Sequence, residues 1–362
     1  MTMVTSTIRR GVATCLAASV VASFAAAAAA AGLSEIATMS GPDRQQKLEA
    51  GAKTEGEMNL YTTLIVDQAV LPLKEAFERK YPFVKFNYIR NSNSPLAVRI
   101  LSEVRAGKPN ADVVVAPIAP ELAKAALLEP FKSPSLSMYS KEFIEPNGLW
   151  AYYRSTYYGI AYNTKLVSEA DAPKGWEDMV APKWMGKIVW NDSDDGAIAV
   201  IDHLRHIWGD SKADDYFKRL AALKVAVSSA SRRTILDLVI AGEHSVFMGA
   251  TLHHVMSSKS EGAPVWFMSP DPVMAKSDPV ELLNTAPHPH AAILFIDFIL
   301  GKEGQEALAK AQYLPNNPAV EPSPEMRPII PYLNGKSVHV ADEIDSPERL
   351  AELNKIFKMV SP

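Results

Sequence analysis

Two adjacent histidines, His253 and His254, are the residues of this sequence best suited to chemistry or to holding a solute. They follow an apolar stretch, His244 to Met248, which ends at Gly249 and is predicted to be a buried strand leading through a turn into a helix. Such a strand can bring the helix start to a cleft floor, where backbone N–H groups meet a solute. Adjacent residues on a helix point about 100° apart, so at most one of the two can face the cleft squarely. We expect one of them to contact an anion, and packing at the helix start is the alternative.

Cationic and hydroxyl side chains near helix starts indicate an anion site. Arg232 and Arg233 open a predicted helix after Ser231. Positive charge at a helix N-terminus opposes the helix dipole, which favours a functional role for at least one of the two. The alternative is that both are surface charges. Helix N-termini and an arginine fork bind phosphate, phosphonate or carboxylate without a metal. The expected ligand contacts are Thr62, Thr63, Ser92, Asn93, Ser94, Pro117, Tyr158, Ser193, Asp194, Ser231, Arg232, His253 and His254.

An acidic loop supports a different interpretation. Asp192, Asp194 and Asp195 indicate a site for an amine or a metal, although such a loop is more often a solvated turn and cap ahead of a helix beginning at Ala197. A zwitterion such as an aminophosphonate would use both signs of charge.

The remaining histidines are expected to lie outside the site. His203 and His206 stand three apart on a predicted helix, beside charged residues that indicate an exposed face. His288 and His290 flank a proline ahead of another helix and are expected to face solvent. The sequence therefore predicts no metal site and no cofactor.

A catalytic function is the alternative from another class. The sequence has no H-E-x-x-H, G-x-S-x-G, P-loop or dinucleotide-binding motif. A secreted metal-dependent hydrolase could use His253, His254 and Asp194, but no general base stands at a motif spacing. We therefore expect a binding protein that is not an enzyme.

The first residues predict export. Arg9 and Arg10 precede an uninterrupted run of small and apolar residues, 11–31, which has the form of a cleaved signal peptide covering about residues 1–32. The one cysteine, Cys15, lies inside this segment, so the mature chain is expected to contain no thiol and no disulfide. The expected location is the periplasm.

Composition favours two lobes. The 362 residues exceed the span that one core usually serves, about 250–300 residues. A net charge of −4 and the lack of a basic block argue against nucleic acid and anionic membranes as partners. We expect a monomer.

Strand and helix signals alternate along the chain, which predicts an α/β architecture with mainly parallel sheets. Ser94 before Pro95 is a plausible helix N-cap, and 289–310 is predicted to be one long helix. The expected strands include Met58 to Thr62, Val84 to Ile89, Asp112 to Ala116 and Val225 to Ser228, and the strand Pro264 to Met268 is expected to be the return crossing between the lobes. Ligands of such sheets bind at the carboxyl ends of the strands.

Several motifs between residues 50 and 335 carry a family resemblance. They are LYT at 60–62, the run from Glu103 to Val114, YGIAYNT at 158–164, WEDM at 176–179 and the run from Ala292 to Gln305. The chain resembles the extracellular solute-binding proteins of ABC importers, in the class that includes the ferric-ion-binding proteins. The resemblance implies a type II periplasmic-binding-protein fold, in which two lobes joined by crossing strands close over a small-molecule solute and deliver it to an inner-membrane ABC permease. The implied lobes are 50–155 with 272–362, and 156–271.

One departure from this class concerns the ligand. Ferric-binding relatives carry two adjacent tyrosines where this sequence has His253 and His254, and Fe(III) prefers oxygen ligands to imidazole. A small organic anion or zwitterion is therefore the expected solute, and ferric iron or another metal is the alternative.

Overall fold

The computed structural model describes residues 32–192, 194–330, 338–340 and 346–361. These residues group into two compact units. Unit 1 comprises the described chain up to Ser137 with Ile144–Ala151 and Val280–Gly301, and unit 2 comprises Met138–Phe143, Tyr152–Pro279 and the described chain from Lys302. The segment from Lys302, which the sequence analysis assigned to the first lobe, thus groups with unit 2. The expected signal peptide, apart from Gly32, lies outside the described residues.

The sheet of unit 1 is built on parallel strands. β1 (Glu57–Thr62) lies between β2 (Lys85–Arg90) and β3 (Val113–Val115) and is parallel to both. The end of β10 (Val273–Leu283) and the short β4 (Leu128–Glu129) add antiparallel pairs. β3 is three consecutive, fully buried valines, as expected of a strand covered by helices on both faces.

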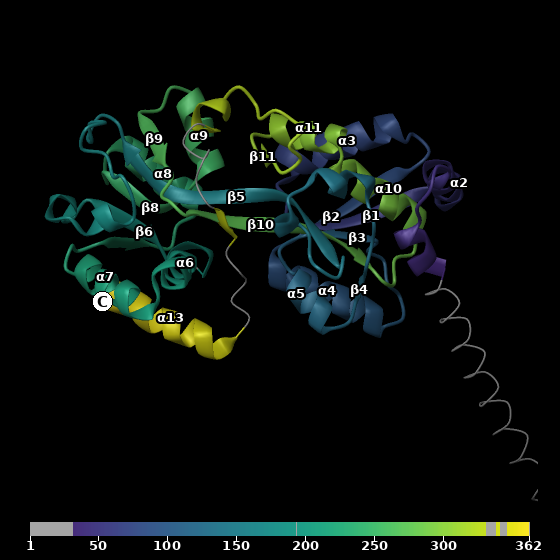
Figure 1. Cartoon of the computed structure of the whole chain (residues 1–362), viewed down its shortest axis with the longest axis horizontal. Coiled ribbons are helices and arrows are strands. Elements are labelled where there is room, and N and C mark those ends of the chain that lie inside the picture. The colour runs from purple at the N-terminus through teal and green to yellow at the C-terminus, as the bar shows by residue number, and fades with distance from the viewer. Residues whose placement is uncertain (1–31, 193, 331–337, 341–345, 362) are drawn as a thin grey trace, which may run out of the picture. The chain divides into compact units, whose positions relative to one another are not determined.

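Helices cover both faces of the unit 1 sheet (Figure 1). One side is packed by α4 and α5, and the other by α2, α3 and α10, where Phe77, Phe86, Phe295 and Phe298 meet edge to face with ring centroids 5.2–5.9 Å apart. Edge-to-face contact suits the aromatic quadrupole and adds to the apolar area buried. These helices are α2 (Arg44–Glu55), α3 (Leu71–Lys80) after a π-helical turn at Val66–Val70, α4 (Asn93–Arg105), α5 (Ala119–Lys124) and α10 (Pro289–Leu300).

The strands of unit 2 form a mixed part of the sheet. β6 (Ile188–Asn191) is parallel to β7 (Ala226–Ser228) and β8 (Val246–Thr251). The unit 2 part of β5 (Trp150–Asn163) is antiparallel to β8, to β9 (Val265–Met268) and to β11 (Leu314–Pro315). The beginning of β10 pairs in parallel with β12 (Val338–Val340).

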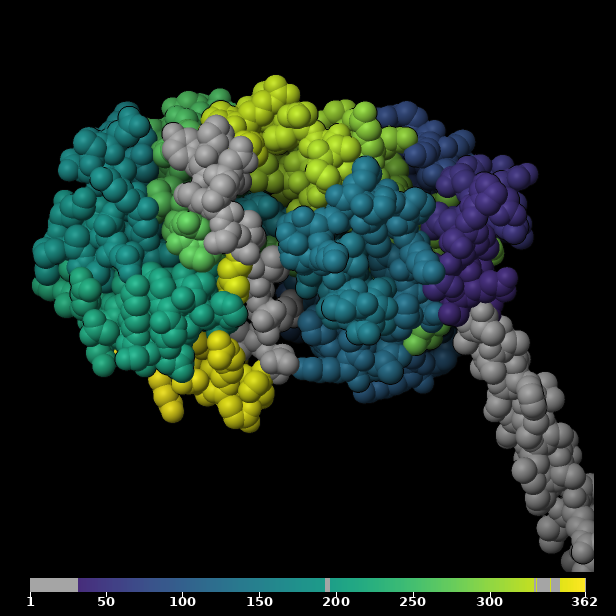
Figure 2. Space-filling model, viewed as in Figure 1, coloured from purple at the N-terminus to yellow at the C-terminus, as the bar shows by residue number. Residues whose placement is uncertain are grey.

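Two groups of helices bury the faces of this sheet. Trp190 of β6 stacks on Phe217 and meets Phe357 edge on, so the C-terminal helix α13 completes the core on one face. Figure 2 shows α13, in yellow, against the surface of unit 2. The helices are α6 (Ala199–Trp208), α7 (Asp210–Ala221) and α13 (Pro347–Val360) on that face, α8 (Arg232–Ala241) and α9 (Leu252–Ser260) on the other, with α11 (Lys302–Lys310) near β11. Short 3-10 turns lie at Pro134–Met138, Lys141–Phe143, Glu177–Val180, Pro182–Trp184 and Arg327–Ile329, and a π-helical turn at Asp194–Ile198.

Two strands carry the chain from one unit to the other. β5 begins in unit 1 and continues into unit 2 from Tyr152, while β10 returns from unit 2 and enters unit 1 at Val280 (Figure 1). The predicted α/β class, in which helices flank the strands, is confirmed, and the strands pair both in parallel and antiparallel. None of the helices described is long and apolar enough to cross a bilayer.

Three local predictions are corrected. The helix expected over 289–310 is two helices, because the chain is extended at Gly301, where an added Cβ would lie 2.6 Å from the carbonyl oxygen of Asp297. Gly249 does not end its strand: it adopts φ +88° as the extra residue of a β-bulge, and β8 continues to Thr251. The N-cap of α4 is Ser92, so Ser94 lies within the first turn.

Gly159 is predicted to tolerate no side chain. In β5 it faces β9, and a Cβ at this position would collide with the carbonyl oxygen of Met268 and lie 2.6 Å from Cζ of Phe267. Gly159→Ala should therefore destabilise unit 2 by about 1–3 kcal/mol, since backbone must move. Tryptophan fluorescence is a suitable probe of thermal unfolding, because five of the six tryptophans belong to unit 2. Gly175→Ala, where nothing lies within 4 Å, is the control. Equal melting temperatures for the two variants would contradict the prediction.

Candidate functional site

The carboxyl ends of three parallel strands meet at one edge of the unit 2 sheet. Asn191 at the end of β6 pairs with Ser228 at the end of β7, and Trp190 pairs with Met248 of β8. The chain then runs from β7 into α8 and from β8, through Thr251, into α9. Open α/β sheets bind solutes at such an edge. The starts of both helices are thus placed where a solute would be met.

The start of α8 presents an arginine over an aromatic ring. Ser231 caps the helix by accepting a hydrogen bond from the N–H of Thr234 at 3.1 Å, as its position before the helix predicts. The guanidinium carbon of Arg232 lies 5.1 Å from the ring centroid of Tyr158, a cation–π arrangement. Tyr158, on β5, stands directly opposite Thr251 of β8. The register of β5 and β8 therefore brings the starts of α8 and α9 together.

The start of α9 holds the histidine pair. Thr251 is its N-cap, and its hydroxyl lies 2.8 Å from Nδ1 of His254. The rings of His253 and His254 meet edge to face at 4.2 Å, and the ring of His253 lies 5.5 Å from that of Tyr313. Both histidines are partly exposed. The helix start is therefore both a packed junction and an accessible surface.

Both imidazoles are held neutral. Burial lowers the pKa of His253 well below its ordinary value, and the charges of His254, Arg154 and Arg232 lower it further. Burial, followed by Arg233 and Arg232, lowers the pKa of His254 to about 4. Nearby positive charge disfavours any added proton or cation. The pair thus lies in a region of positive potential at neutral pH.

Sequence reasoning missed Arg154, which lies on β5. Its side chain is 12% exposed; it contacts Asp278 of β10 at 3.2 Å and donates hydrogen bonds to the hydroxyls of Tyr153 at 3.0 Å and Thr156 at 3.2 Å. Its guanidinium carbon also lies 4.3 Å from the ring centroid of Tyr313. The sequence did contain a signal for Arg154, because it is a lone arginine inside an aromatic strand. Burying an unpaired charge there would cost free energy, so a partner for Arg154 could have been expected.

Unit 1 has a corresponding edge. Thr62 at the end of β1 pairs with Arg90 and Val115, the last residues of β2 and β3. The buried hydroxyl of Thr62 donates to the carbonyl of Val115 at 2.9 Å and accepts from the N–H of Leu64 at 3.0 Å. Thr63, the next residue, is partly exposed. Thr62 therefore shapes the loop, and Thr63 presents its side chain at the edge.

The other unit 1 residues expected at the site share this edge. Ser92 and Ser94 are exposed and Asn93 is partly exposed at the start of α4, directly after β2. Pro117 is partly exposed after β3. The structure thus brings together all six expected contacts of unit 1 at the carboxyl ends of three parallel strands.

The acidic loop can be described only in part. Asp192 is exposed, and its N–H donates to the carbonyl of Ser228 at 3.0 Å. Ser193 lies outside the described residues. Asp194 begins a π-helical turn, and its side chain is likewise outside the description.

His203, His288 and His290 differ from expectation, and His206 does not. His203 is buried, not exposed, and its Nδ1 lies 2.8 Å from Nδ1 of His339, a residue far along the chain. Burial is the main cause that lowers the pKa of His203 to about 3, and the charges of His339 and His206 lower it further. His206 is exposed as predicted. His288 and His290 do not simply face solvent, because each contacts a carboxylate. Within the described residues, no group of three or more His, Cys, Asp or Glu has the arrangement of a metal site.

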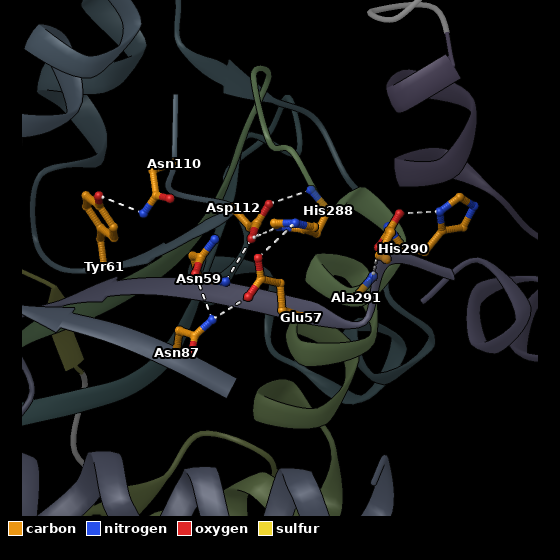
Figure 3. A network of polar contacts seen from close by, with 10 residues as sticks. Glu57, Asn59, Tyr61, Asn87, Asn110, Asp112, His288, His290 and Ala291 are labelled. Carbon is orange, nitrogen blue, oxygen red and sulfur yellow. Dashed lines mark hydrogen bonds and ion pairs between the residues drawn. The ribbon is translucent and has the colours of Figure 1, made fainter. Parts of the chain in front are cut away.

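A polar network in unit 1 uses one of these histidines (Figure 3). The fully buried carboxylate of Asp112 accepts from the backbone N–H groups of Asn59 at 2.8 Å and His288 at 2.7 Å. It also lies 2.9 Å from Nδ1 of His288, a bond that raises the pKa of that imidazole. Burial raises the pKa of Asp112 although His288 opposes the shift. This network joins the strands β1 and β3 to the start of α10 and so fixes the unit 1 sheet.

Known proteins resemble the chain over most of its length. A family model for bacterial extracellular solute-binding proteins matches residues 108–330. An uncharacterized protein of Haemophilus influenzae is 29% identical over 277 residues, covering 72% of this chain and 79% of that protein. An Fe(3+)-binding periplasmic protein of Serratia marcescens is 24% identical over 239 residues, covering 62% and 68%. The solved periplasmic binding protein AfuA of Actinobacillus pleuropneumoniae, with exogenous fructose-6-phosphate bound, is 26% identical with a TM-score of 0.63, covering 84% and 99%.

Proposed function

Because the chain belongs to the family of bacterial extracellular solute-binding proteins, in its type II class, we propose that its solute is a small organic anion or zwitterion. The family supplies the solute-binding component of ABC importers. The chemical classes that fit are phosphate esters, phosphonates and carboxylates. Delivery to an inner-membrane permease and export through the N-terminal signal peptide belong to the same proposal.

The positive potential around the histidine pair carries this proposal. Arg154, Arg232 and, for His254, Arg233 all lower the pKa of these imidazoles, so the field there favours an anion. The N-termini of α8 and α9 add their own partial positive charge and their N–H groups. Neutral imidazoles can still offer hydrogen bonds to the solute.

The residues of unit 1 are proposed as further solute contacts. Hydroxyl groups and an amide are accessible at the carboxyl ends of β1 and β2, and Pro117 follows β3. α/β sheets bind ligands at this edge. The start of α4 adds backbone N–H groups beside Ser92. In unit 2, Ser231, Tyr158 and Asp194 remain proposed contacts, as does Ser193.

Ferric iron is the competing ligand, since one relative is named as an Fe(3+)-binding protein. Fe(III) is a hard cation that prefers phenolate and carboxylate oxygens, whereas the pair at the start of α9 is imidazole. The arginines near the pair would also repel a trivalent cation. The sugar phosphate bound by AfuA gives the anion proposal a precedent within the fold.

A thermal-shift screen of the mature protein tests the proposal. The panel contains phosphate esters, phosphonates, carboxylates, polyamines and Fe(III). A ligand with micromolar Kd, present at millimolar concentration, should stabilise the protein by about 4 kcal/mol. We expect this from an organic anion, without turnover of phosphate esters in the presence of Zn²⁺. Stabilisation by Fe(III) alone, with a charge-transfer colour, would contradict the proposal, and product formation would favour a hydrolase.

A further inference from the structure

We propose that Arg154 is a second cation of the solute site in unit 2, and that the solute therefore carries a doubly charged group, as phosphate monoesters and phosphonates do. This inference rests on the proposed function, because it concerns the same site. It narrows the solute from organic anions in general to dianions. It also assigns a binding role to a residue that the sequence motifs do not mark.

Arg154 lies on the same strand as Tyr158. Side chains alternate along a strand, so Arg154, Thr156 and Tyr158 share one face of β5. Nη1 of Arg154 donates to the hydroxyl of Thr156 at 3.2 Å, and Nε donates to the hydroxyl of Tyr153 at 3.0 Å. Arg232 covers the ring of Tyr158 from the start of α8.

The ring of Tyr313 contacts both Arg154 and the histidine pair. Its centroid lies 4.3 Å from the guanidinium carbon of Arg154 and 5.5 Å from the ring centroid of His253. The charges of Arg154 and Arg232 both act on the His253 imidazole. Two guanidinium groups whose charges act on one neutral imidazole can together bind a group that carries two negative charges.

Arg154 is already oriented for binding. Among the described residues its contacts use Nε, one N–H of Nη1 and one of Nη2, which leaves two of the five guanidinium N–H groups for a solute oxygen. Asp278, 14% exposed, balances its charge in the absence of solute. Because these contacts hold the guanidinium group of Arg154 in one orientation, less conformational entropy is lost when a solute binds.

The test compares two isosteric probes, fructose 6-phosphate and fructose 6-sulfate, by calorimetric titration at pH 7.5, with 2-aminoethylphosphonate and acetate as further probes. The phosphate ester and the phosphonate are largely dianionic at that pH, whereas the sulfate ester is a monoanion. We expect the wild type to prefer the phosphate ester to the sulfate ester by about tenfold or more. Arg154→Gln should weaken binding of the phosphate ester by about tenfold and reduce this preference.

Two further variants separate binding from folding. Arg154→Gln combined with Asp278→Asn removes both charges, so no unpaired carboxylate is left buried, and it should show the same loss of preference. Arg205→Gln removes another buried arginine of unit 2, paired with Asp210 at 2.8 Å, and should leave the preference unchanged. Binding of both probes with equal affinity, or an unaltered preference after Arg154→Gln, would overturn the inference. Binding of acetate alone would overturn the dianion inference and leave the proposal of an organic anion standing. If neither the four probes nor any other anion of the thermal-shift panel bound, both the inference and the proposed function would be overturned.

Discussion

Replacing Asp112 with alanine is expected to lower the free energy of unfolding of unit 1 by about 3–5 kcal/mol. The carboxylate is fully buried and accepts two backbone hydrogen bonds as well as the contact with the His288 ring. Without it, the N–H groups of Asn59 and His288 lose their acceptor where water has little access. Each such loss costs about 1–3 kcal/mol, more than the bond itself contributed.

Urea unfolding followed by far-UV circular dichroism is the appropriate measurement, because tryptophan fluorescence reports mainly on unit 2. Glu75→Ala is the matched control: it removes an equally short ion pair of unit 1, to Arg79 at 2.8 Å, in which both side chains are more than two-thirds exposed. Exposed pairs of this kind contribute about 0.2–1 kcal/mol. If Asp112→Ala were no more destabilising than Glu75→Ala, the network around Asp112 would not contribute measurably to the stability of unit 1.

Replacing Arg232 with alanine is expected to weaken binding of the organic anion by about 100-fold or more, with little change in the melting temperature of the unbound protein. Arg232 stands at the first turn of α8, where its charge opposes the helix dipole and therefore contributes little to folding. Its effect should exceed that of Arg154, whose charge Asp278 already balances.

Calorimetric titration with the tightest anion of the thermal-shift panel measures this loss. Arg99→Ala is the matched control, since Arg99 also lies over a tyrosine ring, 5.4 Å from the centroid of Tyr61, but on a helix of unit 1. We expect Arg99→Ala to bind the anion as the wild type does. If Arg232→Ala left the affinity for the anion unchanged, Arg232 would not be a solute contact but only a surface charge.

The strands and the capping of α8 could be predicted because their signals are local. Consecutive valines at 113–115 indicate a buried parallel strand, and Ser231 ahead of a helical pattern indicates an N-cap. The two helices at 289–310 could not be separated from sequence, because an apolar pattern runs through Gly301 and only the packing of its backbone interrupts the helix.

Residues whose role depends on distant partners were not predictable in this way. His203 was expected on an exposed face, but it is buried against residues distant in sequence, among them Trp176 and His339, the latter 136 residues away. Arg154 needs Asp278 and Tyr313, which come from other strands and turns. The histidine pair was recognised as notable, but its neutral state follows from burial and from arginines that the fold assembles around it.

In the proposed site, the neutral state of the histidine pair bears on how binding should depend on pH. Burial lowers the pKa of His254 to about 4 and the pKa of His253 well below its ordinary value, so both imidazoles are neutral at neutral and alkaline pH. A phosphate monoester, in contrast, exchanges its second proton at about pH 6. An inflection near that pH in a plot of affinity against pH is therefore expected from the ionisation of such a solute and not from this histidine pair.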